Sequence, residues 1–337
     1  MPHWLLKAAA QGAIAAAPLG DRLDRAARVH VTRSLTIGEA AFATKLRQCR
    51  HHVSAARSVR TARPFAPHAL ELGTGWYPIV PIGLWLCGAR RVTTIDKNPL
   101  LEPERVRRTV QLYDTAARNG VLDRLLPGAW ADRVATLRDA AAWADEEDPE
   151  LLLHRLGVDV VVGDARATGL DAGSVDLVVS NNTFEHVPPS TLLEILLEFR
   201  RVTSARAVMS HFVDMADHYA YFDRSLSQYH YLRFSDRAWR LLNGGIQYQS
   251  RLRISDYRDL LAEAGFSILQ EEHGQALPHD LERVPIADRF QHYRREDLLV
   301  LRAWLTSVPT VVEVEAALPA EEPETPAPAP EPTVTAA

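Results

Sequence analysis

The chain has 337 residues, 47% of them hydrophobic and 24% charged, with a formal net charge of −5. A chain of this length can bury one large core or two modest ones. The presence of only two cysteines, Cys49 and Cys87, excludes a small fold held by disulfides, and the recurring Leu, Ile and Val exclude a wholly disordered chain. The chain contains no run of 18 or more apolar residues, so the sequence predicts no membrane-spanning helix. We expect a cytoplasmic location, since the Ala-rich start is interrupted by polar residues and is not typical of a signal peptide.

Positive charge is concentrated in the first part of the chain. Residues 1–65 contain eleven Lys and Arg against three acidic residues, a balance near +8, which leaves the remainder near −13. We interpret this segment as a helical N-terminal extension that serves as a lid, with its basic residues on a solvated face. Peripheral contact with a membrane surface, or with an anionic acceptor or RNA, is the alternative.

After this extension, short apolar runs alternate with helical patterns. Strands are expected over 69–72, 91–95, 158–162, 175–180, 205–210, 266–269 and 298–305, with helices over 78–87 and 256–264. This alternation is the pattern of a parallel sheet flanked by helices. We therefore expect one α/β domain over 66–308, with an aromatic-rich insertion at about 212–250. Residues 309–337 are rich in Pro, Glu and Ala, and we expect them to form a disordered tail.

The first predicted strand runs into Glu71-Leu72-Gly73-Thr74-Gly75. The two glycines allow the backbone to turn and to approach a ligand closely at the carboxyl edge of the sheet. A dinucleotide-binding dehydrogenase would need a third glycine where Pro78 stands, and the chain has no Gly-Lys-Ser/Thr phosphate loop. The expected ligand is therefore a nucleoside with a small, uncharged link.

Three later strands deliver polar groups to the same edge. The second ends at Asp96, 21 residues beyond Gly75, a spacing that suits a carboxylate accepting from the ribose hydroxyls. The third is followed by Asp164 and Ala165, and the fourth by Asn181 and Asn182. Each aspartate alone is also compatible with a helix cap or a turn. The ordered series of strand ends indicates a nucleoside site.

These motifs resemble those of the class I S-adenosylmethionine-dependent methyltransferases, over roughly residues 66–275. The segment 176–188, which ends in Glu-His-Val-Pro, is similar to the fourth-strand motif of that family, and Gly-Trp-Tyr-Pro at 75–78 is similar to bacterial methyltransferase-like proteins. The resemblance implies a transferase with a Rossmann-like, doubly wound, mostly parallel seven-stranded sheet. It also implies S-adenosyl-L-methionine as the cofactor.

The same resemblance implies a role for each motif residue. Glu71, Gly73 and Gly75 would line the methionine moiety, and Asn181 or Asn182 would approach its amino-acid end. Asp96 would bind the ribose. Asp164 would accept a hydrogen bond from the adenine amino group, and the Ala165 N–H would donate to the ring.

Candidates for a general base follow the fourth and fifth strands. A base is needed where the acceptor must lose a proton, and a histidine titrates close to neutrality. His186 and His211 are the two candidates, and for each the alternative is a structural role. His211, Asp214 and His218 also suggest a metal site, but their spacing fits no strong zinc pattern, and we expect no metal.

The predicted insertion combines aromatic residues and arginines, which suit a polar or anionic small molecule. Its candidate substrate-binding residues are Tyr219, Tyr221, Arg224, Tyr229 and Tyr231. The alternative is a packed subdomain in which the aromatics form a core. A nucleic-acid partner is not expected, because the body of the chain is acidic.

The sequence therefore predicts S-adenosylmethionine-dependent methyl transfer to a small polar acceptor, such as a sugar, a carboxylate or a secondary metabolite. One alternative is a methyltransferase that acts on RNA or on a lipid-linked acceptor. Another is a non-catalytic methyltransferase-like protein that uses the site for binding. The sequence does not indicate the acceptor atom or the oligomeric state.

Overall fold

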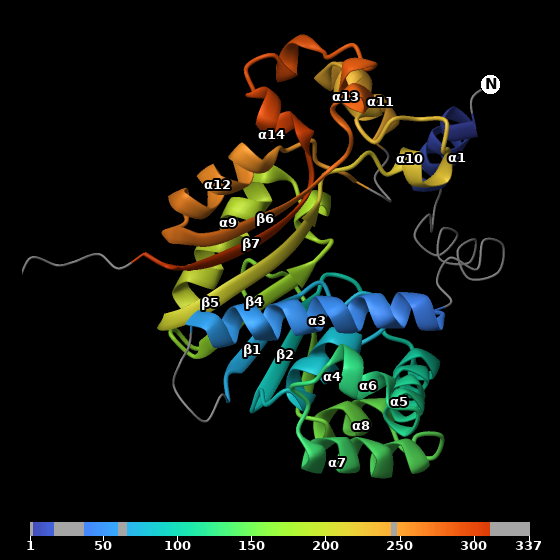
Figure 1. Cartoon of the computed structure of the whole chain (residues 1–337), viewed down its shortest axis with the longest axis vertical. Coiled ribbons are helices and arrows are strands. Elements are labelled where there is room, and N and C mark those ends of the chain that lie inside the picture. The colour runs from blue at the N-terminus through green and yellow to red at the C-terminus, as the bar shows by residue number, and fades with distance from the viewer. Residues whose placement is uncertain (1–2, 17–36, 60–65, 244–247, 311–337) are drawn as a thin grey trace, which may run out of the picture.

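The computed structural model describes residues 3–16, 37–59, 66–243 and 248–310. A seven-stranded sheet forms its centre, in the order β3-β2-β1-β4-β5-β7-β6 (Figure 1). Strand β7 pairs antiparallel with β5 and β6, and the other pairs are parallel. The predicted Rossmann-like, mostly parallel seven-stranded sheet is thus confirmed. The strands are β1 (His68–Leu72), β2 (Arg91–Asp96), β3 (Val158–Val162), β4 (Val175–Asn181), β5 (Thr203–Asp214), β6 (Phe266–Gln275) and β7 (Val300–Pro309).

Helices cover both faces of the sheet because its strands carry apolar side chains on both sides. On one face, Ala69 and Leu177 belong to a core shared with the helices α3 (Glu39–Val59), α4 (Ile79–Leu86), α5 (Pro103–Arg118), α6 (Val121–Leu125), α7 (Ala131–Ala142) and α8 (Pro149–Arg155). On the other face, Leu70 and Val178 pack against α9 (Pro189–Val202) and α12 (Ile254–Glu263). Neighbouring residues of one strand thus face opposite cores. Cys49 and Cys87 are both buried free thiols.

Three strands differ from their predicted bounds by more than one residue. Strand β5 begins at Thr203 and continues to Asp214, so His211 lies within it and not at its end. Strand β6 extends to Gln275, and β7 begins at Val300 and continues to Pro309. Strands β6 and β7 extend further than predicted because they pair antiparallel. The pairing includes exposed polar residues, which lie outside the apolar runs used to predict the strands. The predicted tail therefore begins after this strand, and its residues 311–337 lie outside the described part of the chain.

A third core lies beyond one end of the sheet, where two inserted segments and the N-terminal helix meet (Figure 1). The ring of Trp4, on α1 (His3–Ala16), lies 4.7 Å from that of His230 and 5.7 Å from that of Tyr219. The sequence predicted the segment after β5 but missed the one between β6 and β7. The first contains α10 (Tyr219–Phe222), η3 (His230–Arg233) and α11 (Asp236–Leu242), and the second α13 (Pro278–Glu282), η5 (Asp288–Phe290) and α14 (Arg295–Leu299).

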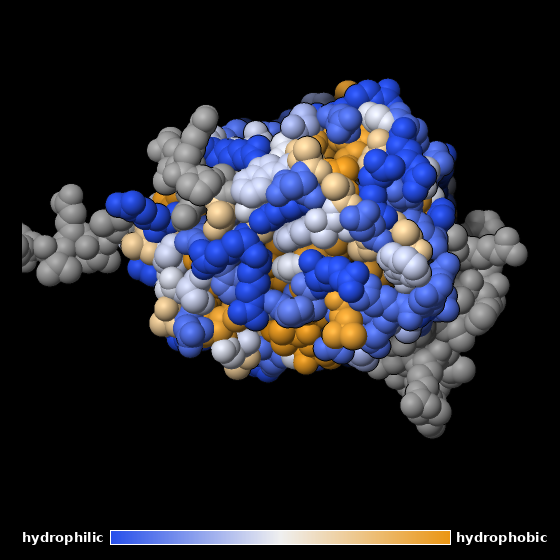
Figure 2. All heavy atoms as spheres, turned by 90° about the horizontal axis from the view of Figure 1, so that it is seen from below, coloured by the Kyte–Doolittle hydropathy of each residue, from blue (hydrophilic) through white to orange (hydrophobic). Residues whose placement is uncertain are grey.

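Figure 2 views the molecule from the end that α7 and α8 occupy in Figure 1. Hydrophilic side chains prevail there and divide the apolar areas from one another. Among the described helices, none has the length and apolar character needed to cross a membrane.

The buried side chain of Arg253 joins the sheet to both inserted segments. It is 0% exposed, and its guanidinium donates to the carbonyl of Met215 at 3.0 Å and to the hydroxyl of Tyr231 at 2.6 Å. It also donates to the carbonyl oxygens of Leu298, at 2.9 Å, and Val300. Four acceptors from three parts of the chain thus depend on one cation.

We expect Arg253→Met to lower the free energy of unfolding by about 3 kcal/mol or more, because it leaves several buried acceptors without a donor. Urea denaturation measures this loss. Arg124→Met, at an exposed position of α6, is the matched control and should change stability by less than about 0.5 kcal/mol. Equal stability of the two variants would contradict the assigned role of Arg253.

His211 lies at the centre of the sheet, with its ring fully buried. Its Nδ1 lies 2.8 Å from the Ser180 hydroxyl on β4, and its ring centroid lies 4.3 Å from that of Phe184. Burial lowers the pKa of His211 to about 3, so the folded protein keeps this ring neutral.

This low pKa predicts a loss of stability in acid. Below pH 6.5 the unfolded chain takes up a proton at His211 that the folded chain excludes, so the stabilisation is complete above that pH and declines toward pH 3. The difference in unfolding free energy between the wild type and His211→Gln should fall by about 1.4 kcal/mol per pH unit below 6.5. Denaturation of both proteins from pH 7 to pH 5 tests this. Parallel pH profiles would show that His211 titrates normally.

Candidate functional site

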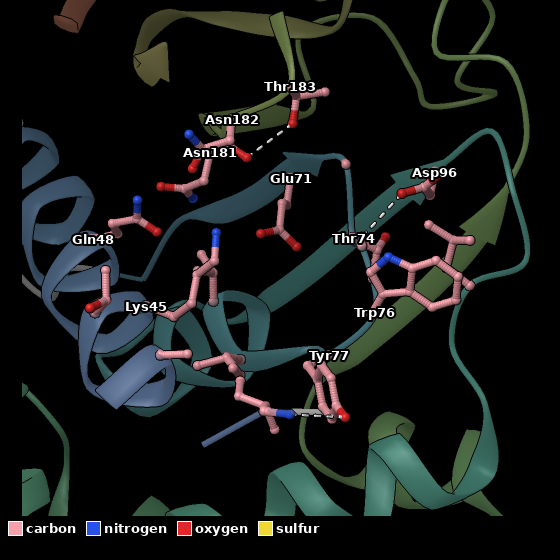
Figure 3. Close-up of a pocket in the computed structure, with 18 of the residues that line it drawn as sticks. Lys45, Gln48, Glu71, Thr74, Trp76, Tyr77, Asp96, Asn181, Asn182 and Thr183 are labelled. Atoms are coloured by element: carbon pink, nitrogen blue, oxygen red, sulfur yellow. Dashed lines mark hydrogen bonds between the residues drawn. The ribbon is translucent and has the colours of Figure 1, made fainter. Parts of the chain in front are cut away.

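A cavity of about 620 Å³ opens at the carboxyl ends of β1, β2 and β4. Helix α3 forms its wall on one side, and the loop after β1 forms its floor (Figure 3). In open α/β sheets, ligands bind at this edge, where the strand order reverses beside the first strand. The predicted residues Glu71, Gly73, Gly75 and Asp96 all line the cavity, together with Asn181 and Asn182.

The loop after β1 requires its first glycine for two reasons. Gly73 has φ +84°, a conformation that residues with a side chain rarely adopt. A Cβ atom at this position would also lie 2.5 Å from the hydroxyl oxygen of Thr183 in the loop after β4. Gly75 has φ +64°. The two loops can therefore approach each other and leave space for a ligand between the strand ends.

Asp96 is held by two backbone donors. The N–H of Gly75 donates to one carboxylate oxygen at 3.1 Å, and the N–H of Asn98 donates to the other at 3.0 Å. Each oxygen can accept further hydrogen bonds, and the side chain is partly exposed at the cavity. This arrangement presents an oriented carboxylate to a ligand with two neighbouring hydroxyls.

Glu71 and Lys45 face each other across the cavity, away from Asp96 (Figure 3). Burial raises the pKa of Glu71 to about 8, although the Thr94 hydroxyl donates to it at 2.8 Å. Burial lowers the pKa of Lys45, and the nearby carboxyl groups of Glu71 and Glu185 oppose that effect. This end of the cavity thus holds an ammonium group and a carboxyl group that are both poorly hydrated.

Polar atoms without partners lie beside this pair. Among the described residues, Oε1 of Gln48 and Nδ2 of Asn181 are buried and make no hydrogen bond, although both residues line the cavity. Asn181 is fixed through its other amide atom, because Oδ1 lies 3.2 Å from Nε2 of His52. Nδ1 of His52 lies 2.8 Å from the Ser210 hydroxyl. Oε1 of Gln48 therefore offers an acceptor to a ligand, and Nδ2 of Asn181 offers a donor.

Asp164 and Ala165 are not among the residues that line this cavity. The Asp164 carboxylate forms a bidentate ion pair with Arg166, at 2.6 Å for the shortest contact, which lowers its pKa to about 2. Both residues directly follow Gly163, whose N–H donates to the carbonyl of Asp96 at 2.9 Å. They lie next to the ribose-binding candidate, and their adenine-binding role remains a prediction.

The two histidine candidates differ in position. His186 is exposed and lines the cavity, and its Nδ1 lies 2.8 Å from the carbonyl oxygen of Tyr248. His211 is buried in the sheet and does not line the cavity. The structure therefore brings only His186 of the two to the cavity.

The predicted substrate-binding residues are not gathered at the cavity. The hydroxyl groups of Tyr219, Tyr229 and Tyr231 donate to backbone carbonyls, so these residues belong to the third core. Tyr221 is half exposed and donates to Asp214 at 2.6 Å. Arg224 lines a separate cavity of about 420 Å³ beside His230 and Asp280.

The residues missed by sequence reasoning come from α3. Lys45, Gln48 and His52 recur at intervals of three and four residues, so they occupy one helical face next to the apolar residues of the core. The sequence signal for these residues is a polar face within an otherwise amphipathic helix. The interpretation of this segment as a lid with a solvated basic face does not account for these residues.

Residues 132–210 match the family model described as a methyltransferase domain. No curated protein matches the chain. Among solved structures, magnesium protoporphyrin IX methyltransferase from Synechocystis PCC 6803, with bound SAH, has a TM-score of 0.45 at 12% identity, covering 86% of this chain and 99% of its own. A putative sarcosine dimethylglycine methyltransferase from Galdieria sulphuraria has a TM-score of 0.42 at 15% identity, covering 81% and 87%.

The family match extends from α7 to the middle of β5 and so includes the third and fourth strand ends. The strand order and the glycine loop beside Asp96 supply the rest of the pattern that the sequence predicted. Residues 132–210 therefore match a methyltransferase domain, in agreement with the resemblance to the class I S-adenosylmethionine-dependent methyltransferases that the sequence predicts.

Proposed function

We propose that the protein transfers the methyl group of S-adenosylmethionine to a polar atom of a small acceptor. The observation that supports this most is the distribution of polar groups in the cavity. An oriented carboxylate, Asp96, stands at one end, and a cation with two unpartnered amide atoms stands at the other. This pattern is complementary to a ligand with a ribose at one end and a free amino acid at the other.

The amino-acid end of the cofactor would take up the unpartnered groups. The ammonium of Lys45 and Nδ2 of Asn181 are donors for a carboxylate, and Oε1 of Gln48 and the Glu71 carboxyl are acceptors for an ammonium. Asp96 would accept from the ribose hydroxyls while the N–H groups of Gly75 and Asn98 hold it in place. These contacts would orient the ligand along the strand ends.

When bound, the cofactor supplies a methyl carbon that an acceptor attacks in line with the bond to sulfur. The protein contributes alignment and the exclusion of water. His186 can also move a proton. Because a carbonyl oxygen only accepts, Nδ1 of His186 donates to Tyr248, and Nε2 is the basic nitrogen of this tautomer.

A small acceptor suits this site better than a polymer. The cavity of about 620 Å³ is partly closed by α3, and the described N-terminal helix α1 packs on the inserted segments beside it. The acidic body of the chain disfavours a nucleic acid. A polar atom on a sugar, a carboxylate or a secondary metabolite is the acceptor that we propose.

Two substitutions distinguish the two ends of the cofactor site. Asp96→Asn should weaken binding of both S-adenosylmethionine and methylthioadenosine by about tenfold or more, near 1.4 kcal/mol, because both ligands carry the ribose. Lys45→Met should weaken binding of S-adenosylmethionine by a similar factor. It should leave binding of methylthioadenosine unchanged, because that ligand lacks the amino-acid end. Isothermal titration calorimetry measures all four affinities.

Arg47→Met is the matched control for Lys45, since Arg47 lies on the exposed face of α3 and should not affect either ligand. A wild-type protein that binds no S-adenosylmethionine would refute the proposed function. Equal weakening of both ligands by Lys45→Met would refute the assignment of the amino-acid end.

The acceptor can be identified with a labelled methyl donor. Incubation of the protein with the donor and a cell extract should label a small molecule that mass spectrometry can identify, and Asp96→Asn should reduce that labelling. Cofactor binding without any labelled product would instead favour a non-catalytic binding protein. Label in RNA or in a lipid fraction would overturn the small-acceptor assignment.

A further inference from the structure

Three potential metal ligands converge next to the cofactor cavity. Glu185 and His186 lie in η2 (Phe184–His186), directly after β4, and His218 precedes α10, after β5. One ligand atom of each lies within 4.8 Å of the others. The centroids of the two imidazole rings are 5.0 Å apart. Because His186 also lines the cavity, this cluster adjoins the place where an acceptor would approach the methyl donor.

The carboxyl group of Glu185 points to a missing partner. Glu185 is 1% exposed, and neither of its side-chain oxygens makes a close hydrogen bond among the described residues, although the backbone N–H groups of Glu185 and Asp214 and the Asn182 side chain lie near enough to favour its charged form. A buried carboxyl group that lacks a close partner destabilises the fold, and a bound cation would remove that penalty. The neighbouring acid Asp214 is in a different situation, because Tyr221 donates to it at 2.6 Å and Arg302 lies 3.8 Å from it.

Both histidines are arranged as ligands. Nδ1 of His186 donates to the Tyr248 carbonyl at 2.8 Å, which orients the ring and leaves Nε2 with a lone pair. A second hydrogen bond of this kind is the usual support of a metal-bound imidazole. Nε2 of His218 is buried and has no hydrogen-bond partner in the part of the chain that the structure describes. The backbone N–H of His218 donates to Gln249 at 3.2 Å and fixes the position of the residue.

We propose that Glu185, His186 and His218 bind one divalent first-row transition-metal ion, whose open coordination positions face the cofactor cavity. Two imidazoles and one carboxylate favour Mn²⁺, Fe²⁺, Co²⁺ or Zn²⁺ over Mg²⁺ or Ca²⁺, which prefer oxygen ligands. Bond lengths of about 2.0–2.2 Å bring neighbouring ligand atoms to about 3 Å from one another. The exposed side chain of His186 can make most of that adjustment.

The role of the metal rests on the proposed function. A metal-bound acceptor hydroxyl loses its proton more readily. In the transfer, the O–H proton passes to solvent, the oxygen forms a bond to the methyl carbon, and the carbon–sulfur bond of the donor breaks to leave a neutral thioether. The metal keeps its charge, and no oxidant or reductant is consumed. With the metal bound, Nε2 of His186 is a ligand and no longer the base.

Metal binding can be measured on the full chain, expressed without a polyhistidine tag and dialysed against a chelator. Titration with Co²⁺, followed by visible absorption and by calorimetry, should show one equivalent bound per chain. Glu185→Gln and His218→Ala should each weaken Co²⁺ binding at least tenfold. His154→Ala, at an exposed histidine of α8, is the control and should bind Co²⁺ like the wild type.

S-adenosylmethionine binding in the same samples separates this inference from the proposed function. Intact cofactor binding without one equivalent of Co²⁺ in the wild type would overturn the metal site alone. Equal Co²⁺ affinity of His218→Ala and the wild type would do the same. If Glu185→Gln or His218→Ala does not fold, His186→Ala decides, because this exposed side chain can be removed without disturbing a core. Full methyl transfer by chelator-treated protein would refute the catalytic role of the ion.

Discussion

The buried imidazole of His52 connects helix α3 to the cofactor cavity. One ring nitrogen lies 2.8 Å from the Ser210 hydroxyl on β5, and the other lies 3.2 Å from Oδ1 of Asn181 at the end of β4. Burial holds the pKa of His52 well below its usual range, so the neutral ring acts as one donor and one acceptor. This pairing fixes α3 across the strand ends and places Lys45, two turns earlier, opposite Glu71. Composition alone suggests that the N-terminal extension is a solvated lid. In the structure, its helix α3 forms a wall of the site.

Backbone geometry completes the cavity from the other side. Gly73 is constrained both by its positive φ and by the nearness of Thr183, so the loops after β1 and β4 depend on each other. The Asp96 carboxylate is likewise held by backbone N–H groups and not, among the described residues, by another charged side chain. A site built in this way is preorganised, because its polar groups do not have to rearrange when a ligand enters.

The sequence predicted the parts of the fold that apolar periodicity controls. Strands β1 to β4 are buried or half-buried parallel strands, and their apolar runs and the acids or amides at their ends were recognisable. Strand β6 was underestimated because its second half is polar and exposed, and antiparallel pairing with β7 holds it in place. Tyr229 and Tyr231 illustrate a second difficulty: an aromatic residue with a hydroxyl looks the same in a pocket and in a core, and here backbone carbonyls accept from both hydroxyls.

The distribution of unpartnered polar atoms links stability to function. Gln48, Asn181, Glu185 and His218 each contain a buried polar atom without a close hydrogen bond among the described residues, and all four lie at the cavity or in the adjoining cluster of Glu185, His186 and His218. Each such atom lowers the stability of the ligand-free fold, and a ligand that supplies its missing partner restores that free energy as binding energy. Interactions of this kind discriminate strongly, because a ligand without the matching donor or acceptor leaves the buried atom unsatisfied. The unpartnered polar groups at this edge of the sheet would thus select both the cofactor and the ion beside it.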